Sequence, residues 1–60
     1  MSTVYNPESE TIAQIERLEL EGRDLRRKVE RAVNPEDRRV LNRLMLEVKL
    51  QIQFLRERLP

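Results

Sequence analysis

The sequence predicts an all-α protein, an antiparallel two-helix hairpin that pairs with a second copy into a homodimeric four-helix bundle. Three observations lead to this prediction. An Asn-Pro-Glu triplet occurs twice, apolar residues recur at helical spacing after each triplet, and the second apolar segment has more apolar faces than one partner helix can cover. The chain is 38% charged and 3% aromatic, a composition typical of long surface helices and coiled coils.

Each helix is predicted to begin at one of the triplets, which start at Asn6 and Asn34. An asparagine side chain accepts a hydrogen bond from the first turn of a helix, and proline fits the first helical position because no amide is lost there. Pro35 also ends the preceding helix, because the residue before a proline is pushed out of the α conformation. A continuous helix kinked at Pro35 is the alternative. The expected elements are a flexible segment at residues 1–5 and a hairpin at residues 6–60, with helices over about 7–32 and 35–59 and a turn at 33–34.

Apolar residues of the first predicted helix form one stripe, which we expect to contact the second helix. The stripe consists of Ile12, Ile15, Leu18, Leu25, Val29 and Ala32, widened by Val33. Gly22 occupies a central position in it, where glycine costs about 1 kcal/mol relative to alanine. Local close packing or a shallow kink is one interpretation of Gly22. A pocket, or a crossing point for another subunit, is the other.

The second predicted helix has a main apolar face that matches this stripe. The face consists of Val40, Leu41, Leu44, Met45, Val48, Ile52, Leu55 and Leu59. Pairing the two sets outward from the turn places Val29 with Leu41, Leu25 with Leu44, Gly22 with Val48, Leu18 with Ile52, Ile15 with Leu55 and Ile12 with Leu59. The paired residue numbers have a nearly constant sum, as two antiparallel helices of equal rise require.

Leu46, Leu50 and Phe54 form a second apolar stripe on the same helix, away from the main face. They are spaced four residues apart, which places them on one side of a helix. One neighbouring helix cannot cover both faces, and a large apolar side chain left in water forgoes about 1.5–3 kcal/mol. We therefore predict an interface at this stripe, flanked by Arg43 and Glu47. Scattered surface leucines without a role are the alternative.

Charge is unevenly distributed between the two ends of the predicted hairpin. Residues 8–21 contain five acidic residues and one basic residue, whereas residues 23–43, around the turn, contain eight basic and four acidic residues. Two hairpins packed head to tail bring opposite charges together, so this polarity favours an antiparallel dimer, within the limits of salt screening. The basic turn end is also a candidate for binding nucleic-acid phosphates, through Arg26, Arg27, Lys28, Arg31, Arg38 and Arg39. The mildly basic pI of about 8.3 and the interspersed acidic residues make nucleic acid the weaker hypothesis.

The sequence contains no motif for catalysis, a metal or a cofactor. It has no Cys and no His, so disulfides, thiolate metal sites and the commonest acid–base side chain are excluded, and its single Gly excludes a glycine-rich phosphate loop. No apolar run reaches the roughly 18 residues of a membrane span, and the lack of Cys fits a reducing compartment. We expect a non-enzymatic cytoplasmic protein, regulatory or adaptor in kind, that self-associates or binds another helix. The alternatives are a nucleic-acid-binding regulator that uses the turn end, and a chaperone-like or secretion-apparatus subunit that binds a heterologous helix.

The predicted architecture is similar to that of the ROP-type hairpin dimer in its length, its two helices and its one short turn. The likeness concerns architecture alone. No sequence motif, functional residue or role is inferred from it.

Overall fold

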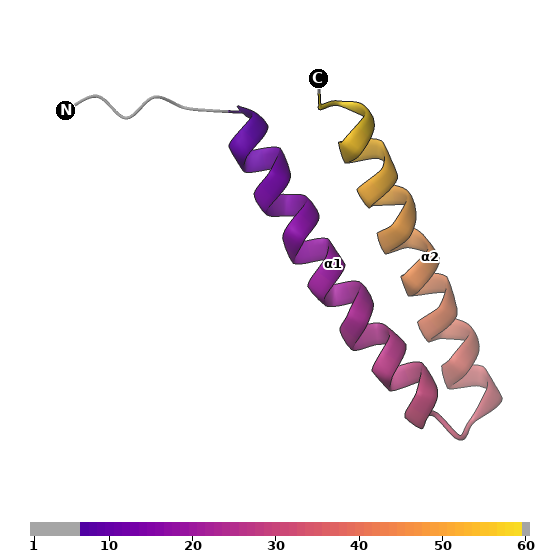
Figure 1. Ribbon diagram of the computed structural model, residues 1–60. Coiled ribbons are helices and arrows are strands. Elements are labelled where there is room, and N and C mark those ends of the chain that lie inside the picture. The colour runs from indigo at the N-terminus through magenta and orange to yellow at the C-terminus, as the bar shows by residue number, and fades with distance from the viewer. Residues whose placement is uncertain (1–6, 60) are drawn as a thin grey trace.

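A computed structural model describes residues 7–59, which form two α-helices packed side by side as an antiparallel hairpin (Figure 1). Helix α1 spans Pro7–Arg31 and helix α2 spans Pro35–Glu57. The chain reverses through residues 32–34, and the other ends of the two helices lie together at the far end of the molecule (Figure 1). The all-helical hairpin is therefore confirmed. The flexible segment predicted at residues 1–5 and the cap predicted at Asn6 lie outside the described residues.

The start of α2 shows why the chain turns at this point. Asn34 has an extended backbone, with φ −76° and ψ 125°, as expected of a residue that precedes a proline. Its side-chain Oδ1 accepts a hydrogen bond of 2.9 Å from the amide of Glu36, and its carbonyl accepts one of 3.1 Å from the amide of Arg38. Asn34 is thus the predicted N-cap of α2, and Pro35 takes the first helical position.

Both helices end slightly earlier than the sequence pattern predicts. The amide of Ala32 donates to the carbonyl of Val29 at 3.2 Å, and the amides of Arg58 and Leu59 donate to carbonyls three residues back at 3.1 Å. Hydrogen bonds to the third preceding residue are those of a tightened last turn, in which the α pattern gives way. The apolar spacing continues through these turns, so spacing alone predicts helices that are one or two residues too long.

The hairpin has a thin core, a single layer of side chains between the two helices. Only Ile15, Leu25 and Val48 are buried, each at 7% exposure, and no large side chain among residues 7–59 is fully buried. Half-buried residues surround these three, namely Leu18, Val29, Leu41, Met45, Ile52, Leu55 and Leu59. Each helix therefore buries one narrow strip of its surface and leaves the rest to solvent.

Four residues that the sequence pattern assigns to the contact between the helices are exposed instead. On α2, Val40 is 59% and Leu44 is 39% exposed; Ile12 on α1 and Val33 in the turn are exposed as well. Val40 lies about 80° around the helix from Val48 at 100° per residue, beyond the strip that one helix covers. Val33 falls after the end of α1 and cannot widen a helical stripe.

Gly22 lies opposite Val48, as the predicted register requires. A Cβ atom at Gly22 would lie 3.6 Å from Cγ1 of Val48, an ordinary van der Waals distance, and no glycine has a positive φ. The position therefore has room for a methyl group and no conformational need for glycine. Close packing against Val48 is present, but it does not exclude a small side chain.

Gly22→Ala is expected to raise the free energy of unfolding by about 0.5–1 kcal/mol, because alanine loses less backbone entropy on entering a helix. Urea denaturation at a fixed protein concentration measures the change. Gly22→Leu is the matched comparison and is expected to lower stability, since a large side chain overpacks the contact with Val48. A loss of stability in Gly22→Ala would instead favour the second interpretation of this glycine, a crossing point for another subunit.

Candidate interaction surface

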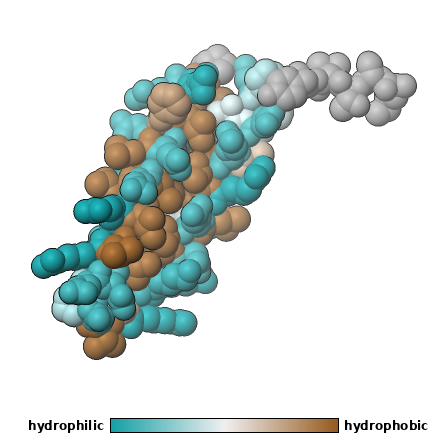
Figure 2. All heavy atoms as spheres, turned by 180° about the vertical axis from the view of Figure 1, so that it is seen from behind, coloured by the Kyte–Doolittle hydropathy of each residue, from teal (hydrophilic) through white to brown (hydrophobic). Residues whose placement is uncertain are grey.

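The exposed apolar side chains are concentrated on α2. Of the eight large ones among the described residues, five lie on this helix, namely Val40, Leu44, Leu46, Leu50 and Phe54. The other three are Ile12 and Leu20 on α1 and Val33 in the turn. Seen from behind, apolar side chains form a broad patch along the hairpin, broken by polar ones (Figure 2). Contiguous exposed apolar surface is often found where proteins bind other molecules.

The outer stripe, defined as Leu46, Leu50 and Phe54, runs from the side of α2 opposite α1 to one edge of the hairpin. The three side chains are 56%, 55% and 59% exposed. Leu46 and Leu50 lie two residues before and after the buried Val48, a rotation of about 200° that places them on the opposite side of the helix. Phe54 lies nearer one edge of the hairpin, where a shallow hollow is lined by Gln14, Leu18, Gln51, Phe54 and Leu55.

Val40 and Leu44 extend this apolar surface toward the turn. At 100° per residue both lie on the same flank of α2 as Phe54, and with Arg39 and Arg43 they line a second small hollow. The sequence pattern placed both in the hairpin contact and so missed them as exposed surface. The angle around the helix between Val48 and each of these two residues was the feature of the sequence that could have indicated their exposure.

Polar groups at the outer stripe are available for contacts. Arg43 and Glu47, predicted to flank the interface, are exposed, and neither forms an ion pair within the described part of the chain. The guanidinium of Arg58 lies over the ring of Phe54, 5.3 Å from its centroid, in a cation–π contact. The apolar spacing did not indicate this contact, although the four-residue spacing between Phe54 and Arg58 allows it.

The opposite edge of the hairpin carries an ion pair between the two helices. Nη2 of Arg56 on α2 lies 3.0 Å from Oε2 of Glu19 on α1, an ion pair that links the two helices. A partly exposed pair of this kind contributes about 0.2–1 kcal/mol. The ion pair was not predicted, because Arg56 and Glu19 lie next to the apolar residues that define the pairing of the two helices and are not among them. The two edges thus differ, because no ion pair among residues 7–59 links the helices at the edge that carries Phe54.

The basic turn end consists of separate exposed side chains. Of its six predicted nucleic-acid contacts, Lys28 pairs with Asp24 at 3.2 Å and Arg26 with Glu30 at 3.9 Å. The remaining four are Arg27, Arg31, Arg38 and Arg39, which are exposed and form no ion pair among residues 7–59. Glu36 and Asp37 occupy the first turn of α2 at the same end. The structure therefore places a mixture of charges there.

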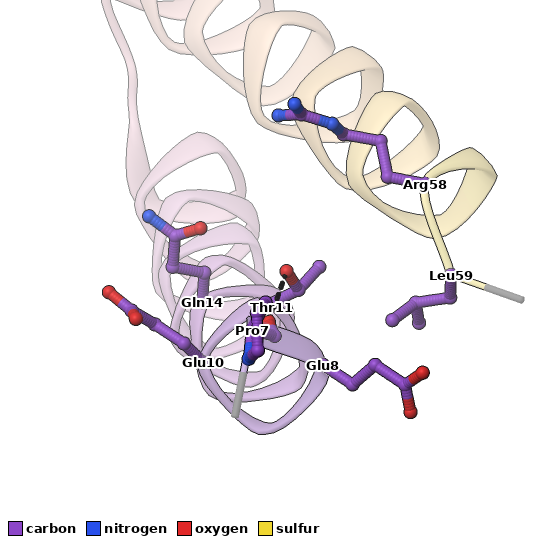
Figure 3. Close-up of a pocket in the computed structure, with 7 residues that line it drawn as sticks. All are labelled: Pro7, Glu8, Glu10, Thr11, Gln14, Arg58 and Leu59. Atoms are coloured by element: carbon purple, nitrogen blue, oxygen red, sulfur yellow. Dashed lines mark hydrogen bonds between the residues drawn. The ribbon is translucent and has the colours of Figure 1, made fainter. Parts of the chain in front are cut away.

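A hollow at the open end lies between the first turns of α1 and the end of α2 (Figure 3). It is lined by Pro7, Glu8, Glu10, Thr11, Gln14, Arg58 and Leu59. The hydroxyl of Thr11 donates to the carbonyl of Pro7 at 2.8 Å, and the carboxylates of Glu8 and Glu10 point to opposite sides of α1 (Figure 3). The acidic groups therefore do not converge on one point.

Within residues 7–59 no three His, Cys, Asp or Glu side chains gather in an arrangement that holds a metal ion. Neither α1 nor α2 is long and apolar enough to cross a membrane. Comparison with protein-family models, curated proteins and solved structures finds no match to this chain. The hairpin's own surface is therefore the basis for a functional proposal.

Proposed function

We propose that this chain is a small non-enzymatic interaction protein that self-associates through the outer stripe of α2 into a homodimeric four-helix bundle. The observation that supports this most directly is the exposure of Leu46, Leu50 and Phe54, each above half, along the outer side and one edge of α2. Full burial of a large apolar side chain contributes about 1.5–3 kcal/mol. The single hairpin leaves that contribution unused.

The thin core supports a second copy of the chain as the partner. Three side chains at 7% exposure are few for residues 7–59, and chains of this size without disulfides or metals usually gain stability from another subunit. In a two-fold dimer the same patch covers itself, so one interface supplies the missing burial to both copies. A four-helix bundle is the common architecture that results when two such hairpins pair.

Sedimentation equilibrium over about 1–100 µM protein tests this proposal. We expect a mass of twice the 7.2 kDa of one chain, and a thermal unfolding midpoint that rises with protein concentration. A cooperatively folded chain that stays at the monomer mass throughout would contradict self-association. That outcome would leave a heterologous helix as the occupant of the outer stripe.

A further inference from the structure

Five exposed residues of α2 recur at alternating spacings of three and four, and we call them the outer seam. They are Arg43, Leu46, Leu50, Gln53 and Glu57. Alternation of three and four is the spacing of positions that face a partner helix in a coiled coil. The seam lies opposite the strip that packs on α1, because Leu46 and Leu50 lie on the far side of the helix from the buried Val48.

The seam has opposite charges at its two ends. Arg43 stands at the end toward the turn and Glu57 at the open end, about 21 Å apart at 1.5 Å per residue. Neither forms an ion pair within residues 7–59. Both also lie seven residues from Leu50, while Leu46 and Phe54 each lie four residues from it. Positions at equal distances on either side of Leu50 therefore carry either opposite charges, Arg43 and Glu57, or large apolar side chains, Leu46 and Phe54.

We propose that two copies pack antiparallel through their outer seams and the adjoining Phe54, with the two-fold axis at Leu50. Arg43 of one copy then lies opposite Glu57 of the partner subunit, and Leu46 lies opposite Phe54 of the partner subunit. This arrangement rests on the proposed self-association and specifies its orientation and register. Each Arg–Glu pair occurs twice in the dimer, because the interface is the same on both copies.

The parallel arrangement is disfavoured by the same residues. It places Arg43 against Arg43 of the partner subunit and Glu57 against Glu57 of the partner subunit, so like charges meet at both ends of the seam. The antiparallel arrangement replaces each of these repulsions with an attraction, which salt then weakens.

A charge exchange tests the register. Arg43→Glu and Glu57→Arg are each expected to raise the dimer dissociation constant about three- to tenfold, because each loses two ion pairs and creates two repulsions. The double variant restores opposite charges in the other order, and we expect its dissociation constant to return to within about twofold of the original. A double variant that is weaker than either single variant would overturn the proposal.

Cysteine cross-linking gives an independent measure of orientation, since the chain contains no cysteine. Arg43→Cys and Glu57→Cys proteins, mixed and mildly oxidised, are expected to form the mixed disulfide dimer, with little homodimeric disulfide from either alone. Homodimeric disulfide of Arg43→Cys would show the parallel arrangement, and a dimer that cross-links in no combination would show that the seams do not meet. Either result overturns the orientation and leaves self-association standing, whereas a monomeric parent protein overturns both.

Discussion

Replacing Leu50 and Phe54 together by glutamate is expected to dissociate the proposed dimer into monomers. Both side chains are more than half exposed on α2, and glutamate is a good helix former, so the hairpin itself has little to lose. In the dimer, however, the two changes bring four carboxylates into the apolar centre of the interface. Unpaired charges at such a place cost several kcal/mol, so we expect the dissociation constant to rise at least about 100-fold.

Sedimentation equilibrium measures the loss of the dimer, and far-ultraviolet circular dichroism reports whether the helices remain. Leu20→Glu is the matched control, because Leu20 is 62% exposed but lies on α1, about 140° around that helix from the buried Leu25. We expect Leu20→Glu to stay dimeric. A dimer that survives both changes on α2, or one that Leu20→Glu dissociates equally, would place the interface elsewhere.

Leu25→Ala is expected to unfold most of the protein at low concentration. Leu25 is one of the three buried side chains among residues 7–59, and truncating a buried leucine to alanine costs about 2–5 kcal/mol. A domain of this length has a total stability of the same order, at about 0.05–0.15 kcal/mol per residue. The expected result in urea denaturation is therefore a weak or absent cooperative transition.

Leu20→Ala provides the comparison for this second prediction. It removes the same atoms from an exposed position of the same helix, and surface changes of this kind usually alter stability by less than about 0.5 kcal/mol. If the two alanine variants unfolded at the same urea concentration, the layer between α1 and α2 would not be the core that stabilises the protein.

The sequence predicted the features of this fold that depend on local chemistry. The cap at Asn34 follows from an asparagine placed before a proline, and the structure shows the expected hydrogen bond to Glu36. The contact of Gly22 with Val48 follows from the equal rise of two antiparallel helices. Both inferences use geometry that varies little from one protein to another.

The width of the contact between the helices was not predictable in the same way. Heptad spacing identifies apolar positions but not how far around α2 the surface of α1 reaches, so Val40 and Leu44 were wrongly assigned to the core. The exposure of Leu46, Leu50 and Phe54 agrees with a stripe outside the hairpin, and its role as an interface stays a prediction. Contacts of long flexible side chains, such as Arg58 over Phe54, depend on rotamers that spacing does not determine.

The thin core has a consequence for how much of this protein persists in a cell. If hairpins with three buried side chains are stable mainly as pairs, folding and pairing share one equilibrium, and the folded fraction rises steeply with the total amount of chain. Chains made in small numbers would spend much of their time open to proteases, whereas chains made in larger numbers would protect one another. The protein would then be mainly folded only above a threshold concentration. A single stabilising change such as Gly22→Ala would lower that threshold.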